Sequence, residues 1–186
     1  MRRDSGRRGS IIQLERETWA ALHGIVLGAL FLLAFVGGLA GLWRLKARYL
    51  SAEGITERTP RLLIGVWVMA IVAWLTVFTG TWIVYPWYRA RPPEGTVDLV
   101  GYPRYFLLDN PELSALHTFA MEWKEHLAWM APMLATSVAI VTLYYGAQLV
   151  RGQELRWPLI ATFTLAFAAA GIAGLLGALI TSAAPV

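Results

Sequence analysis

The sequence predicts an all-α integral membrane protein: a four-helix bundle with a long connection, rich in proline and aromatic residues, between helices 2 and 3. Of its 186 residues, 57% are hydrophobic and only 15% are charged. Four stretches contain no Asp, Glu, Lys or Arg, namely residues 18–43, 62–88, 127–150 and 157–186. A helix rises about 1.5 Å per residue and a bilayer core is about 30 Å thick, so about 20 apolar residues suffice to cross it. Each stretch is therefore long enough to span a membrane.

Composition restricts the possible function classes. The chain contains no cysteine, which excludes disulfides, thiolate metal sites, Cys-ligated iron–sulfur clusters and covalently attached c-type haem. The net charge of +4 is modest, and the basic residues flank the apolar stretches. Phospholipid headgroups explain that placement better than nucleic acid does. We therefore expect the lipid bilayer as a partner, no nucleic acid, and a single membrane domain over residues 1–186.

The first predicted span covers about residues 18–43 and follows an arginine-rich tail, residues 1–17. Basic residues before an apolar run are also typical of a signal peptide. This run is far longer than the apolar part of a signal peptide, and no small-x-small cleavage pattern ends it. We therefore expect it to remain as the first spanning helix.

The second helix is predicted to begin after Thr59–Pro60, because a proline is a frequent helix boundary, and to span about residues 62–88. The fourth is predicted to open at Trp157–Pro158 and to end near Ala184, a span of about 157–184. Both termini would then lie on one side of the membrane.

The third helix is predicted to begin outside the membrane and to cross it over about residues 127–150. Asn110 followed by Pro111 is typical of a helix N-cap and first turn. Pro132 removes one backbone hydrogen bond and clashes with the carbonyl of Ala128, four residues earlier. We therefore expect a kink near Ala128.

Small residues recur at four-residue spacing in the predicted spans. This spacing allows helix backbones to approach closely in lipid, so we expect a tight bundle. The alternative is that some of the glycines make room for a flat cofactor. The pairs are Gly24 and Gly28, Gly37 and Gly41, Thr76 and Gly80, and Gly174 and Ala178.

The connection over residues 89–126 is long for so small a protein and is expected at the membrane interface. Its aromatic residues fit an interfacial aromatic belt, which many membrane proteins have. The alternative is a lid that covers the end of the bundle and shields a site from water. Its prolines and aromatics include Pro92, Pro93, Tyr102, Pro103, Tyr105 and Phe106.

The orientation follows from the distribution of basic residues. The two connections on the opposite side, residues 44–61 and 151–156, are short and have the higher density of Lys and Arg. Cytoplasmic loops carry an excess of these residues. We therefore expect a multi-pass protein of a bacterial cell membrane with both termini on the non-cytoplasmic side, although the arginine-rich tail argues the other way.

All three histidines are expected at the end of the bundle that carries this long connection. His23 and His126 lie at similar depth in the first and third helices, near the hydroxyls of residues such as Thr79. A polar side chain in lipid is costly unless it is paired or ligated, so each is a candidate for a functional site. His117 precedes His126 by nine residues, half a turn out of phase, so the two point to opposite faces of a helix.

Two histidines at one depth on different helices fit the axial ligands of haem b. We expect His23 and His126 to hold the haem iron, with Met130 on the same helix face as His126 and His117 as the less favoured ligand. Glu122 is placed to orient the His126 ring or to accept a proton from a quinol. The residues expected to pair with the haem propionates are Arg89, Arg91 and Arg104.

Two functions remain open from the sequence. The first is a membrane electron-transfer subunit with haem b between helices 1 and 3, exchanging electrons with quinone. The alternative is a cofactor-free accessory subunit of a larger membrane complex, and both imply other membrane protein subunits as partners. The predicted spans carry no acid, which a di-iron carboxylate bundle requires, and motifs of hydrolases or nucleotide-binding enzymes are absent. No enzyme class is assigned.

Overall fold

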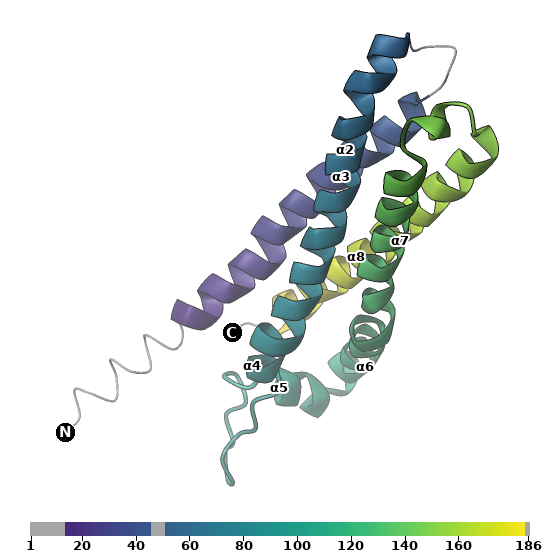
Figure 1. Cartoon of the computed structure of the whole chain (residues 1–186). Helices are drawn as coiled ribbons and strands as arrows, with labels where there is room; N and C mark the ends of the chain where they lie inside the picture. Colours follow the sequence, from purple (N-terminus) through teal and green to yellow (C-terminus); the bar gives the residue numbers. More distant parts are fainter. Residues whose placement is uncertain (1–13, 46–50, 185–186) are drawn as a thin grey trace.

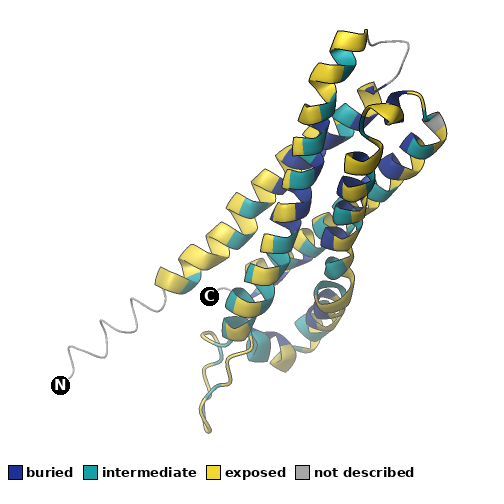
Figure 2. Ribbon diagram, viewed as in Figure 1, coloured by how far each residue is buried: buried dark blue, intermediate teal, exposed yellow. Residues whose placement is uncertain are grey.

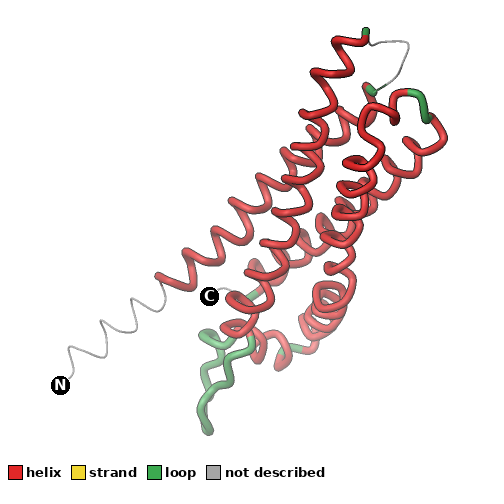
Figure 3. The backbone as a smooth tube through the Cα atoms, in the orientation of Figure 1, coloured by secondary structure: helices red, strands yellow, loops and turns green. Residues whose placement is uncertain are grey.

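The computed structural model describes residues 14–45 and 51–184, and in this part of the chain it contains helices, turns and loops but no strand (Figure 3). Four of its helices are long and apolar enough to cross a membrane: Leu14–Arg44, Ala52–Tyr88, Pro111–Val150 and Glu154–Ala183. The predicted all-α fold with four spanning helices is confirmed. The chain is a multi-pass integral membrane protein surrounded by lipid.

Short π and 3₁₀ segments interrupt three of the four spanning helices, whose α-helical parts are labelled in Figure 1. The first spanning helix contains η1 (Leu22–Val26) and, after it, α2 (Leu27–Arg44). The second consists of α3 (Ala52–Thr79), η3 (Gly80–Val84) and α4 (Tyr85–Tyr88). After α5 (Pro103–Asp109), the third consists of α6 (Pro111–His126), η4 (Leu127–Trp129), α7 (Met130–Tyr145) and η5 (Gly146–Val150). The fourth is α8 (Gln153–Ala183).

The four helices pack as a ring in which α2 contacts α3, α3 contacts α7, α7 contacts α8, and α8 returns to α2. Buried side chains line the inside of this ring, and most of the outward-facing positions are exposed (Figure 2). Phe163 lies at the centre with no exposed surface, and its ring stacks on Phe35 at 5.6 Å between centroids. Exposed leucines and valines on the outside are expected in lipid, which solvates apolar side chains.

Two predicted helix starts are wrong, and both helices begin earlier. The second begins at Ala52, because the hydroxyl of Ser51 accepts a hydrogen bond from the backbone N–H of Gly54 at 3.2 Å and caps it. Pro60 therefore lies inside α3. The fourth begins at Gln153, so that Pro158 also lies inside a helix.

The first helix is also longer than predicted. Of the tail over residues 1–17, residues 1–13 lie outside the described residues, whereas Leu14 and the three residues after it are already helical. The apolar span and the polar tail thus share one helix, because the uncharged stretch sets where the membrane is crossed and not where the helix begins.

The third helix begins and breaks as predicted. The side chain of Asn110 accepts a hydrogen bond from the backbone N–H of Glu112 at 3.0 Å, which caps α6. The α-helical pattern then stops at His126 and resumes at Met130, with a 3₁₀ turn between them. The break falls at the carbonyl that Pro132 obstructs.

Only some of the glycines lie in close helix contacts. A Cβ on Gly38 would stand 2.7 Å from the ring of Phe163, and a Cβ on Gly65 would stand 3.3 Å from the backbone of Gly38. Gly41 likewise faces Leu62 closely. The prediction of close packing is wrong for four of the glycines named from the sequence, which have nothing within 4 Å of a Cβ: Gly24, Gly28, Gly37 and Gly174.

A buried arginine closes the end of the bundle where α2 ends and α8 begins. Arg156 is only 2% exposed and donates a hydrogen bond from its Nη1 to the carbonyl oxygen of Leu45 at 2.8 Å. That carbonyl follows the last residue of α2 and has no partner within its own helix. Arg156 therefore connects the end of the first helix to the start of the fourth.

The opposite end, where α4, α5 and α6 meet the last turns of α8, is here called the mouth (Figure 1). A second apolar core forms there around Leu107, which has no exposed surface. The same core includes Met121 from α6 and Ile180 from α8. Part of the long connection is thus packed over this end of the bundle, which is the arrangement expected of a cover.

Candidate functional site

His23 faces the second helix at the mouth, where both helices contain a π segment. Its Nδ1 lies 3.0 Å from the hydroxyl oxygen of Thr79. That hydroxyl donates its own hydrogen to the Leu75 carbonyl at 2.8 Å, so the arrangement that satisfies both groups puts the imidazole proton on Nδ1. Nε2 is then left with its lone pair. The hydroxyl expected beside His23 from the sequence is therefore in contact with it.

Gly80 provides the space that the His23 ring occupies. A Cβ on Gly80 would stand 2.8 Å from Cε1 and 3.4 Å from Nε2 of His23. Such a contact is shorter than Cβ atoms make, so a side chain at position 80 would displace the His23 ring. The Cε1–Nε2 edge of His23 therefore lies against Gly80.

Lys124 brings an amine into the same region from α6. Its Nζ would lie 3.1 Å from a Cβ on Gly177 of α8, and its charge acts on the imidazole of His23. Among the residues that the structure describes, this amine makes no hydrogen bond and has no carboxylate within 4.0 Å. The group formed by His23, Thr79, Gly80, Lys124 and Gly177 is called the His23–Lys124 cluster below.

His126 lies apart from this cluster, on the outer face of α6. Its Nδ1 is 3.1 Å from the carbonyl oxygen of Glu122 and 3.3 Å from the carboxylate of the same residue. Both side chains are exposed. Glu122 thus stands next to the His126 ring, where the sequence suggested it, but the structure does not bring His126 towards His23. Met130 is also exposed, at the start of α7.

His117 points the other way, as its half-turn offset from His126 predicts. It is 7% exposed, and its Nδ1 lies 2.6 Å from the hydroxyl oxygen of Tyr88, whose ring stacks on the imidazole. Beside this pair, the hydroxyl of Tyr85 donates a hydrogen bond to the carboxylate of Glu125. The rings of Tyr85 and Tyr88 stack at 6.3 Å between centroids.

The three arginines expected near haem propionates lie on the connection at the mouth. The guanidinium of Arg89 lies over the Tyr85 ring, 5.1 Å from its centroid, which is a cation–π contact. Arg104 is half-buried on α5, and its charge acts on both Tyr88 and His117. Arg91 is exposed. Arg89 therefore contacts Tyr85, and Arg104 lies close enough to Tyr88 and His117 for its charge to act on both.

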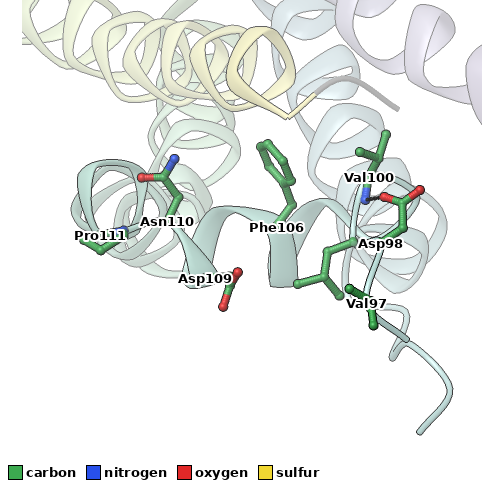
Figure 4. A pocket seen from close by; sticks show the side chains of 8 residues that line it. Val97, Asp98, Val100, Phe106, Asp109, Asn110 and Pro111 are labelled. Carbon is green, nitrogen blue, oxygen red and sulfur yellow. Dashed lines mark hydrogen bonds between the residues drawn. The ribbon is translucent and has the colours of Figure 1, made fainter. Parts of the chain in front are cut away.

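An open hollow lies outside the helices, between the loop before α5 and the start of α6 (Figure 4). Asp98 in its wall accepts a hydrogen bond from the backbone N–H of Val100 at 3.0 Å, and Asp109 stands across from it. Within residues 14–45 and 51–184, no three His, Cys, Asp or Glu side chains come together as a metal site would require.

Lys124 was not among the residues predicted for the site, because the third span was predicted to begin at about residue 127 and Lys124 precedes it. The signal was present in the spacing. His117, Ala120, Met121 and Lys124 stand at intervals of three and four residues, which places them on one helix face. The first three are buried, so the fourth is directed into the mouth as well.

No protein-family model, curated protein or solved structure matches this chain. The function must therefore be argued from the geometry alone.

Proposed function

We propose that this chain is a membrane-embedded electron-transfer subunit that exchanges electrons with quinone, and that the His23–Lys124 cluster binds the quinone headgroup. The amine of Lys124, unpaired among apolar helices, is the observation that carries the proposal. Lys124 is half-buried, and an amine withdrawn in part from water without a partner costs free energy. Ionisable groups kept inside membrane proteins mark ligand or proton sites by default. A ligand oxygen at this position would relieve the cost.

Quinone chemistry fits the two groups of the cluster. The ring oxygens of a quinone accept hydrogen bonds, and Lys124 offers donors on a long side chain. When the ring is reduced, its oxygens become hydroxyls, and Nε2 of His23 offers the lone pair that a hydroxyl donates to. An apolar tail would remain in the lipid. Access from the bilayer is supported by Gly24 and Gly28, which no side chain from another helix approaches within 4 Å of a Cβ position.

The second part of the proposal is haem b held by His23 and His126. Iron would take the same Nε2 lone pair, so with haem bound the quinone headgroup would be held by Lys124 and not by His23. A haem-ligating histidine usually donates its other ring nitrogen to a nearby acceptor, and the Nδ1 contact of His23 with Thr79 is of that kind. His126 would have to turn away from Glu122 to reach an iron inside the bundle. The quinone site is therefore the part of the proposal that the geometry favours, and haem is the part that most needs a direct measurement.

Quinone binding is tested with the purified full-length chain in lipid nanodiscs, using decylubiquinone as the probe and quenching of tryptophan fluorescence as the signal. A hydrogen bond from a charged donor contributes about 1.5–3 kcal/mol, so we expect Lys124→Gln to raise Kd about tenfold to a hundredfold. Arg151→Gln, an exposed position at the opposite end, is the control and should leave Kd unchanged. Equal Kd values in the two variants would refute the site.

A second variant pair tests the placement of His23. In Gly80→Ala the new methyl group would displace the His23 ring, and we expect Kd to rise about tenfold, as for the loss of one hydrogen bond. In Gly24→Ala, one residue from His23 in sequence, the methyl group meets nothing within 4 Å and Kd should not change. A similar Kd in both variants would remove His23 from the site.

The haem is tested by the reduced-minus-oxidised absorption spectrum of the chain from haem-replete cells. Sharp α and Soret bands that are lost in both His23→Ala and His126→Ala would establish the ligand pair. If the bands were lost only in His117→Ala, His117 would be an iron ligand and the proposed pair would be wrong. A colourless chain that binds no quinone would leave the alternative, an accessory subunit, and co-purification with other membrane subunits would then be the informative experiment.

We further propose a bacterial cell membrane, with the mouth and both termini on its non-cytoplasmic side. The support is the density of Lys and Arg in the short connections at the opposite end, residues 44–61 and 151–156. Quinone would then be bound near the outer surface of the membrane, where protons exchange with the external medium.

A further inference from the structure

The second ionisable group of the mouth lies beside the His23–Lys124 cluster and is not used by it. It consists of two hydrogen-bonded pairs, Tyr88 with His117 and Tyr85 with Glu125. Both tyrosines are on α4 and both of their partners are on α6. The pairs therefore join the end of the second helix to the segment that carries Lys124.

We propose that these two pairs carry protons between the external water and the quinone headgroup. This inference rests on the proposed quinone site. Reduction of a quinone to the quinol takes up two electrons and two protons, and each ring carbonyl becomes a hydroxyl. The electrons come from a one-electron donor, either a haem b or a redox-active partner subunit, which is oxidised twice. The protons must come from water.

The burial of the four side chains is graded from water to the interior. Glu125 is exposed, Tyr85 and Tyr88 are half-buried, and His117 is buried. Carboxylate, phenol and imidazole all gain and lose protons or pass them along a hydrogen bond. A charge on His117 is opposed by Arg104 of α5 and favoured by Glu125 of its own helix, while Arg89 lies over Tyr85. From Trp157 to Ala183, α8 contributes no titratable side chain.

Helix α6 carries residues of both the His23–Lys124 cluster and the two tyrosine pairs. Glu125 follows Lys124 directly, so the carboxylate that accepts from Tyr85 and the amine directed at the headgroup belong to consecutive residues. His117 is seven residues from Lys124 on the same helix face, about 10.5 Å along the axis. Glu125 is therefore the member of these pairs that is nearest in sequence to a headgroup bound at Lys124.

The test uses the full chain in a lipid film on an electrode, with decylubiquinone as the probe and the electrode as the electron donor. The rate of quinone reduction is measured from pH 5 to pH 9. Because general acid catalysis contributes about a hundredfold or more, we expect Tyr88→Phe, His117→Gln and Glu125→Gln each to slow reduction at least about tenfold at high pH, with Kd unchanged. Glu112→Gln, an exposed carboxylate in the first turn of the same helix, is the control.

The outcomes separate this inference from the proposed function. A film in which Lys124→Gln reduces quinone as fast as the unmodified chain, and binds it equally well, would overturn the quinone site itself. In the alternative outcome, Lys124→Gln is the variant that slows reduction, while Tyr88→Phe and Glu125→Gln leave the rate and its pH profile unchanged. That result would overturn the proton route alone. Glu125 is exposed, so its substitution keeps the test valid even if the buried His117 variant fails to fold.

Discussion

The close contact between Gly38 of α2 and Phe163 of α8 predicts that an alanine at position 38 destabilises the bundle. The neighbouring glycine, Gly37, provides the control. A Cβ on Gly38 would stand 2.7 Å and 2.8 Å from two atoms of the Phe163 ring. The ring cannot move away easily, because it has no exposed surface and stacks on Phe35. Gly37, the preceding residue, has nothing within 4 Å of its Cβ position.

Both substitutions, Gly38→Ala and Gly37→Ala, gain the same helix propensity of about 0.5–1 kcal/mol, so the difference between them isolates packing. Forcing an extra methyl group into a well-packed core costs about 1–3 kcal/mol. We therefore expect Gly38→Ala to be less stable than Gly37→Ala by about that amount. Equilibrium unfolding in mixed micelles with increasing dodecyl sulfate, followed by circular dichroism, measures the difference. Equal midpoints for the two variants would refute the proposed contact between the first and fourth helices.

Two further predictions concern the closed end and the orientation of the bundle. Arg156→Ala leaves the Leu45 carbonyl without its donor and should lower the free energy of unfolding by about 1–3 kcal/mol, whereas exposed Arg151→Ala should change it by less than about 0.5 kcal/mol in the same micelle assay. The chain has no cysteine, so Val97→Cys, 95% exposed at the mouth, and Glu57→Cys, exposed at the opposite end, can be labelled singly in intact cells. We expect an impermeant maleimide to label the first and to reach the second only after permeabilisation, and the reverse pattern would invert the proposed orientation.

The spanning helices could be predicted from the sequence because charge is what a bilayer excludes. The uncharged stretches located all four, although they did not locate the helix ends. Ser51 shows why: the helix it caps begins in water, where a hydroxyl and a backbone N–H decide the boundary. The proline that suggested a later start, Pro60, is accommodated within α3.

The glycines were predicted less well, because spacing shows which residues share a face but not which helix that face meets. Gly37 and Gly38 are consecutive, yet only at Gly38 would a Cβ meet a side chain of another helix. Tertiary packing decides between them, and no local pattern contains that information. The same limit applied to Lys124, whose charge suggested water while its register with His117 placed it inside the mouth.

The histidines illustrate a third limit. His23 and Thr79 could be placed at one depth by counting residues from the membrane boundary, and they are in contact. The pairing of His23 with His126 required the rotation of α6 as well as its depth. In the structure the buried face of that helix carries His117, and the His126 ring faces outward.

The two ends of the bundle differ in a way that bears on ligand access. At the closed end, Arg156 bonds to the end of α2, and the core around Phe163 fills the interior. At the mouth, Gly24 and Gly171 face open space, although polar groups lie nearby. A ligand that separates the first helix from α8 at the mouth would therefore displace lipid instead of core side chains. Because burial of the core supplies most of the stability, replacing lipid at these two positions would cost little free energy of folding.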